Sequence, residues 1–169
     1  MTEMLGPMDS LVVHDAREED MLGDQRLIGF YRLWQAKRRD RRLPARSDLT
    51  HDELKPWFGN LILLDVIDGG RDFRYRLFGM NIVRQAGFDM TGKFLSEYPI
   101  PDVLPHFLTT HREVVRRAAP AFSEHNPRVA LVRKRRRLIV PFGDDGRTVD
   151  RTMTVNYAVE VVREPDQYL

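Results

Sequence analysis

The stretch Arg74–Lys93, RYRLFGMNIVRQAGFDMTGK, decides the fold of this 169-residue chain. Apolar and charged side chains alternate at its start, which predicts a half-buried strand. A short helical turn over 79–86 follows, and Gly87 is placed to cap its carboxyl end. The stretch contains no nucleophile, metal-ligand cluster or phosphate-binding loop. The pattern is typical of a scaffold that encloses a binding site, and it favours recognition over catalysis.

Five segments have the composition of β-strands. Continuous apolar runs indicate buried strands, and alternating runs indicate half-buried ones. Turn signals at 68–70 and 143–146 join neighbouring segments into hairpins. The predicted strands cover residues 61–66, 73–77, 122–126, 131–142 and 148–162.

Helices are predicted before the first hairpin and after it. Thr50 and Glu53 form a capping box for a short helix over 51–58. A longer helix over 102–118 has one clean apolar stripe and begins at the potential cap Asp102. The order of elements is helix, two strands, helices and three strands. It predicts an α+β domain, an antiparallel sheet with helices on one face.

A further helix over 25–40 flanks this domain at its N-terminus. Its apolar stripe either packs on the sheet of its own chain or forms a dimer interface. We expect a homodimer, because an exposed aromatic stripe would be an unusual surface patch. The residues of the stripe are Leu27, Phe30, Tyr31 and Trp34.

Length and composition predict one domain. Hydrophobic residues make up 42% of the chain, enough for a core. We expect a loose arm over 1–24, a single domain over 25–162 that includes the flanking helix, and a tail over 163–169. The chain has no apolar run of about 20 residues and no signal-peptide pattern at its start. We expect a cytoplasmic protein.

Five segments resemble the PAS domain in their order and spacing. Their amino-acid sequences are similar to those of a bacterial subfamily common in alphaproteobacteria. The resemblance covers residues 26–160. It implies a five-stranded antiparallel sheet in the order 2-1-5-4-3 with helices over one side. It also implies a sensor or interaction module that binds a small ligand or a protein partner. The segments that carry it are Leu43–Arg46, Leu61–Val66, Phe73–Gly79, Gly87–Lys93 and Val140–Gly146.

The resemblance also limits the cofactors. Light-sensing PAS domains of the flavin and yellow-protein types bond to a cysteine, and this chain has none. Some PAS haem sensors use a histidine on the long helix. His111 returns to the apolar stripe of that helix, whereas His106 lies about 200° from Leu104 on the polar side. His111 is therefore either a haem ligand or a core-edge histidine bonded to the backbone, and we expect no paired metal site.

The expected cleft lies between the sheet and the helices. Arg151 interrupts an apolar strand face, so it binds either an anionic ligand or a carboxylate of the protein itself. The other side chains of the cleft fill the core or contact the ligand. The candidate ligand-binding residues are Tyr75, Asn81, Phe88, His111, Arg151, Met153 and Tyr157.

Nucleic-acid binding and catalysis are the alternatives to a sensor. The basic run Arg133–Arg137 lies in a predicted strand, so its charges alternate between faces. It forms either a solvated strand with one or two inward side chains or a nucleic-acid surface. The formal net charge of +2 gives nucleic-acid binding little support. No catalytic motif of the hydrolase, metalloprotease, P-loop or dinucleotide type occurs, so we expect no enzyme.

Overall fold

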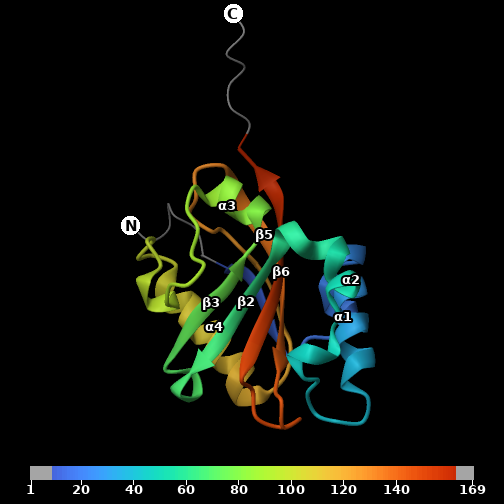
Figure 1. The fold of residues 1–169 in the computed structure, drawn as a ribbon. Helices are drawn as coiled ribbons and strands as arrows, with labels where there is room; N and C mark the ends of the chain where they lie inside the picture. The colour runs from blue at the N-terminus through green and yellow to red at the C-terminus, as the bar shows by residue number, and fades with distance from the viewer. Residues whose placement is uncertain (1–8, 163–169) are drawn as a thin grey trace, which may run out of the picture.

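A computed structural model describes residues 9–162 and shows a six-stranded antiparallel sheet (Figure 1). Its order is β1-β4-β5-β6-β2-β3, so the predicted five-strand order is confirmed and one strand is added at the edge. The strands are β1 (Asp9–His14), β2 (Leu61–Ile67), β3 (Asp72–Phe78), β4 (Ala121–His125), β5 (Val132–Phe142) and β6 (Arg151–Val161).

The added strand corrects the prediction of a loose arm over 1–24. β1 pairs with β4, with Val12 opposite Ser123, because an apolar run here meets the free edge of the sheet. Further along, Ala16 and Met21 are buried in the main core. Residues 1–8 of the predicted arm lie outside the described residues, as does the tail over 163–169.

Four α-helices and five short 3-10 helices connect the described strands. The α-helices are α1 (Gln25–Arg38), α2 (His51–Leu54), α3 (Met80–Ala86) and α4 (Leu104–Arg117). The 3-10 helices are η2 (Glu18–Met21), η3 (Arg46–Asp48), η4 (Lys55–Asn60), η5 (Asp68–Gly70) and η6 (Leu95–Glu97).

Helix boundaries follow the predicted signals with two differences. Thr50 and Glu53 form the predicted capping box of α2, and Gly87 ends α3 in the left-handed conformation at φ 85°. The helix predicted over 51–58 divides after α2, because Pro56 in η4 has no N–H to continue the α-helical pattern. α4 begins after Val103 rather than at Asp102, and no side chain caps it.

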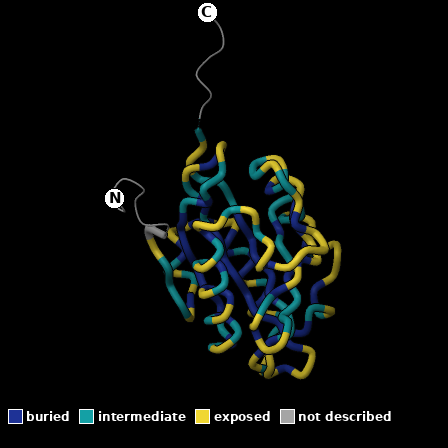
Figure 2. Tube along the Cα trace, turned by 90° about the vertical axis from the view of Figure 1, so that its left-hand side faces the viewer, coloured by how far each residue is buried: buried dark blue, intermediate teal, exposed yellow. Residues whose placement is uncertain are grey.

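The sheet is covered on both faces, by the domain helices on one face, as predicted, and by the flanking helix α1 on the other. α1 packs on what we call the outer face, and α3 and α4 lie over the inner face (Figure 1). Burial is concentrated in the strands between these helices (Figure 2). No helix in the described part of the chain is long and apolar enough to cross a membrane.

The aromatic stripe of α1 packs on its own sheet. Leu27 and Phe30 are fully buried, Trp34 is 4% exposed and Tyr31 is 8% exposed. The indole Nε1 of Trp34 donates a hydrogen bond of 2.7 Å to the carbonyl oxygen of Pro141 on β5. The stripe is therefore not the exposed patch on which the expected dimer interface rested. The homodimer itself stays a prediction.

Candidate functional site

A small cavity lies between the inner face of the sheet and helices α3 and α4. The space open to the centre of a water molecule measures ≈ 30 Å³, which accommodates one or two waters. Its lining combines apolar and polar side chains. The lining residues are Ile62, Leu64, Tyr75, Phe78, Ile82, Tyr98, Phe107, His111, His125, Pro127, Arg135, Arg137, Thr154 and Asn156.

Strand alternation brings the basic run of β5 to this cavity. Arg135 and Arg137 are two residues apart, so both face inward while Arg136 faces outward. In the sheet register, Arg135 lies opposite His125 on β4, and Arg137 lies opposite Asn156 on β6. Three neighbouring strands thus place charged and polar groups in one buried space.

Arg135 carries a buried charge without a carboxylate partner among the described residues. Its side chain is 3% exposed, and its Nη1 donates a hydrogen bond of 2.8 Å to Oε1 of Gln85 on α3. Burial lowers the pKa of Arg135 to about 10, so the guanidinium remains charged at neutral pH. The neutral amide of Gln85 does not compensate this charge.

Arg137 is held by several groups around the cavity. Its Nε donates a hydrogen bond of 2.7 Å to the hydroxyl of Ser123, and its guanidinium carbon lies 4.9 Å from the ring centroid of Phe107. Its Nη2 is 3.4 Å from Nε2 of His106. Arg137 is therefore oriented by the protein and contributes positive potential to the cavity.

His111 offers a bare acceptor nitrogen to the cavity. Its Nδ1 is 2.9 Å from the carbonyl oxygen of Phe107, and a carbonyl only accepts, so Nδ1 is the protonated nitrogen. Nε2 is then unprotonated, and it is buried without a hydrogen-bond partner. Burial, reinforced by the charge of Arg137, lowers the pKa of His111 to about 3. Of the two alternatives for this residue, the structure shows the hydrogen bond to the backbone, and the residue also lines the cavity.

Further buried polar atoms without partners surround the same space. Nδ1 of His125, Oγ1 of Thr154 and Oδ1 of Asn156 are all buried and unpaired. Buried polar groups in native proteins are nearly always satisfied, by protein or by bound molecules. A cluster of unsatisfied atoms around one cavity therefore indicates a site that takes up water or a ligand.

Two tyrosines add neutral hydroxyls. Burial raises the pKa of Tyr75 well above its usual value and raises that of Tyr98 to about 12. Both phenols stay protonated at neutral pH and are available as hydrogen-bond donors. Tyr75 is the second predicted ligand-binding residue, with His111, that lines the cavity.

Two further predicted residues lie near the cavity without lining it. Phe88 stacks on Phe78 at a centroid distance of 6.2 Å and supports the apolar wall. Asn81 is exposed, and its Nδ2 donates to Oδ1 of Asn60 at 2.9 Å. Asn60 in turn donates to the backbone oxygen of Asn156 at 2.9 Å, so this pair links α3 to β6.

Arg151, Met153 and Tyr157 lie on the outer face, which corrects their placement in the cleft. The alternation of β6 was predicted, but its polar members face the cavity and its apolar members face α1. Arg151 pairs with protein carboxylates, including Asp65 at 3.3 Å and Asp144 at 3.6 Å. Of the two alternatives for Arg151, the structure thus shows the pairing with the protein itself.

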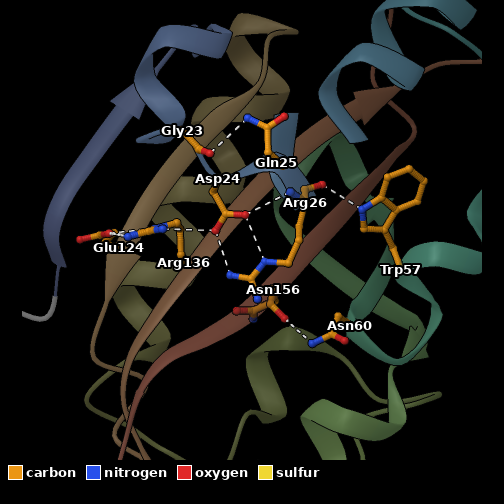
Figure 3. A network of polar contacts seen from close by, with 9 residues as sticks. All are labelled: Gly23, Asp24, Gln25, Arg26, Trp57, Asn60, Glu124, Arg136 and Asn156. Atoms are coloured by element: carbon orange, nitrogen blue, oxygen red, sulfur yellow. Dashed lines mark hydrogen bonds and ion pairs between the residues drawn. The ribbon is translucent and has the colours of Figure 1, made fainter. Parts of the chain in front are cut away.

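The outer face has its own polar network at the start of α1 (Figure 3). The buried N-cap residue Asp24 accepts from Arg26 at 2.9 Å and from Arg136 at 3.2 Å. Arg136 also donates to Glu124 at 2.7 Å. The guanidinium of Arg26 covers the ring of Tyr157 at 4.1 Å. Charges on this face are thus matched within the chain.

Several residues that line the cavity, Arg135 and Arg137 among them, are not among the predicted ligand-binding residues. Alternation alone predicts one or two inward arginines in the run Arg133–Arg137, and two are found. It does not say which face of the sheet holds the cavity. That choice depends on which helices cover each face, and the prediction had chosen the face of β6 that carries Arg151, Met153 and Tyr157.

The cavity residues do not fit haem. Nε2 of His111 is a suitable ligand atom, but drug-sized and cofactor pockets measure about 300–1,000 Å³, far more than the ≈ 30 Å³ found here. Among the described residues, no group of three histidine, cysteine, aspartate or glutamate side chains is arranged to hold a metal ion.

Comparison with solved structures gives distant similarities. The light-state structure of the blue-light photoreceptor Aureochrome1 LOV is 9% identical, covers 66% of this chain and 90% of that chain, and gives a TM-score of 0.44. A light-oxygen-voltage domain studied with a flavin analogue is 13% identical, with coverages of 64% and 83% and a TM-score of 0.46. The PAS domain of an HTR-like protein from Haloarcula marismortui is 14% identical, with coverages of 64% and 90% and a TM-score of 0.36.

No curated protein matches the chain. A family model does: the PAS domain model PAS_5 matches residues 24–155. This match extends from the buried cap of α1 to the middle of β6, and so includes the helices and strands that enclose the cavity. The chain belongs to the PAS domain family.

Proposed function

We propose that this PAS domain is a sensory or regulatory module that binds a small ligand in the inner cavity and signals through association with a partner. PAS domains are generally sensory and signalling modules. The observation that supports ligand binding is the cluster of buried, unpaired polar atoms around the cavity. Leaving such atoms unsatisfied costs about 1–3 kcal/mol each, so a bound molecule that pairs with them stabilises the domain.

Native mass spectrometry of the protein purified from its own host tests this function. A ligand of the cavity is expected to add a defined mass that disappears on denaturation. A matched variant, Thr154→Val, removes one of the unpaired hydroxyls and is expected to reduce the bound fraction. Only the bare protein mass, together with no response of cavity residues to any small molecule in NMR titrations, would contradict ligand binding.

A ligand-free interaction adaptor is the second candidate, and the small size of the cavity favours it. At ≈ 30 Å³ the space is nearly filled by side chains. An adaptor is expected to bind its partner with the same affinity when Arg135 or Thr154 is changed. A ligand sensor is expected to lose part of its response in the same variants. The two functions are therefore separated by one partner-binding assay on the cavity variants.

The remaining features of the proposal are a non-enzymatic, cytoplasmic protein of the alphaproteobacterial PAS type that forms a homodimer. Light scattering over micromolar concentrations tests the homodimer. Nucleic-acid binding is a weaker alternative, because Arg135 and Arg137 face the cavity and Arg136 pairs with Glu124. A nucleic-acid surface would show affinity that falls steeply with salt concentration.

A further inference from the structure

We propose that the ligand of the inner cavity is a small carboxylate-type oxyanion, between formate and acetate in size, held by Arg135. This inference rests on the proposed function, because it names the chemical class of the molecule that the cavity binds. It goes beyond that function in specifying charge, size and the residue that recognises them.

The first step is the charge of Arg135. A buried cation without a counter-charge is unfavourable in a protein interior, and such groups are normally paired. The next residue of the strand shows that this chain pairs its structural arginines. Arg136 lies 2.7 Å from Glu124 and 3.2 Å from Asp24. Arg135 is more deeply buried, yet among residues 9–162 only the amide of Gln85 bonds it.

The second step is the supply of donors around the same space. The hydroxyl of Thr154 is buried and unpaired, and the phenols of Tyr75 and Tyr98 line the cavity in their neutral form. A carboxylate offers about four lone-pair sites on two oxygens. Arg135 and these hydroxyls can fill those sites. The bare Nε2 of His111 is then left for a bound water or for a hydroxyl of the anion.

The third step is size. The space suits one or two water molecules, so only an anion of few atoms enters without displacing the walls. The lining includes the apolar side chains of Leu64, Phe78 and Ile82. They can accept a methyl group but not a second charge. Longer dicarboxylates and aromatic acids are therefore expected to bind poorly.

NMR titration of the full chain with acetate and with acetamide tests the inference, because the two molecules have nearly the same shape and differ in charge. Ionic strength is held constant with sodium chloride. Acetate is expected to shift the backbone amide signals of Gln85, His125 and Asn156 in a saturable way. Acetamide is expected to bind at least about tenfold more weakly, since a charge-assisted hydrogen bond is roughly twice as strong as a neutral one.

Two variants of the same strand localise the effect. Arg135→Met removes the buried charge and is expected to weaken acetate binding at least about tenfold. Arg133→Met changes an exposed arginine two residues away and is expected to leave the affinity for acetate unchanged. A third variant, Arg135→Lys, keeps the charge without the planar fork and is expected to retain part of the affinity. Dispersed amide spectra verify that each variant is folded.

The outcomes separate this inference from the proposed function. If acetamide binds as well as acetate, or if Arg135→Met retains acetate affinity, the anion assignment is overturned while a ligand-binding cavity stands. If neither acetate nor acetamide shifts any cavity signal at concentrations up to about 50 mM, and no small molecule is found bound to the purified protein, the anion assignment and the ligand-binding function are both overturned. Saturable acetate binding that depends on Arg135 supports both.

Discussion

Arg135 and Arg136 are neighbours in the chain but lie on opposite faces of the sheet, in opposite electrostatic surroundings. Arg136 joins a network with Asp24 and Glu124 that fastens the start of α1 to the outer face. Arg135 points to the inner cavity, where its bonded partner among the described residues is a neutral amide. At the start of α1 the charged groups of the outer face are paired within the chain, whereas several buried polar atoms around the inner cavity have no partner.

This difference indicates that the outer face stabilises the fold, and it supports the proposal that the inner face binds the ligand. The outer face combines a large apolar cluster with matched charges, as expected of a surface that stabilises the fold. The inner face keeps several buried polar atoms unpaired around a cavity. The cavity is also lined by His111 and Arg135, whose pKa values are lowered by burial, and ionisable groups with shifted pKa values occur at functional sites more often than elsewhere. Variants on the two faces should therefore have different consequences for stability.

The largest loss of stability is expected from Trp34→Ala on the outer face. Truncating a buried aromatic side chain typically costs about 3–5 kcal/mol, and Trp34 is 4% exposed. Urea unfolding measures this loss. Trp34→Phe serves as the control, because it keeps most of the packing and removes the hydrogen bond to Pro141, for about 1 kcal/mol. A loss below about 1 kcal/mol for Trp34→Ala would show that α1 contributes little to the fold.

Asp24→Ala is expected to cost about 2 kcal/mol, because it leaves Arg26 and Arg136 without a shared acceptor. Its carboxylate also accepts from the backbone N–H of Arg26 at 3.1 Å as the cap of α1. Asp24→Asn keeps the cap and removes the charge, so it should cost less than Asp24→Ala. Equal losses for the two variants, measured by urea unfolding, would mean that the charge network accounts for the whole effect and that the cap of α1 adds nothing measurable.

On the inner face, the buried His111 is expected to make the free energy of unfolding decrease as the pH falls. The pKa of His111 is lowered from 6.5 to about 3 in the folded protein, so below pH 6.5 the unfolded chain binds more protons. Stability is therefore fully present above pH 6.5 and is lost as pH falls, by about 1.4 kcal/mol per pH unit. His111→Gln should flatten this slope by that amount between pH 6 and pH 4 in unfolding measurements. An unchanged slope would place the titration of this histidine elsewhere.

The strand order was implied by the PAS resemblance, whereas most element boundaries were predicted from the residues themselves, because alternation, capping and turn residues act locally. Thr50 with Glu53 and the left-handed Gly87 are examples in which the local chemistry decided the outcome. The face of each strand that borders the cavity was not predictable in the same way. β6 alternates cleanly, but whether Met153 or Thr154 points to the cavity depends on where α1 and α4 pack.

The need for tertiary contacts also explains why Arg135 and Arg137 were not predicted to line the cavity. A basic run in a strand has an ordinary interpretation as a solvated surface, and Lys134 does pair with Glu160 at 3.0 Å. Only tertiary contacts distinguish Arg135, which is buried, from Arg133, which is exposed. β1 was missed for a related reason, since an apolar run of a few residues becomes a strand only where a sheet edge is free to pair with it.

The smallest expected effect gives the sharpest comparison of the two faces, because it differs in sign between adjacent residues. Arg136→Met should destabilise the domain by about 1 kcal/mol, since it leaves Glu124 and Asp24 with fewer partners. Arg135→Met removes a buried charge that has no carboxylate partner among the described residues, and Gln85 is partly exposed and can bond water instead. Stability should therefore stay the same or rise by about 1 kcal/mol. Urea unfolding without added anion measures both. Equal destabilisation would mean that Arg135 is a structural residue, and the contrast between the two faces would then not extend to their arginines.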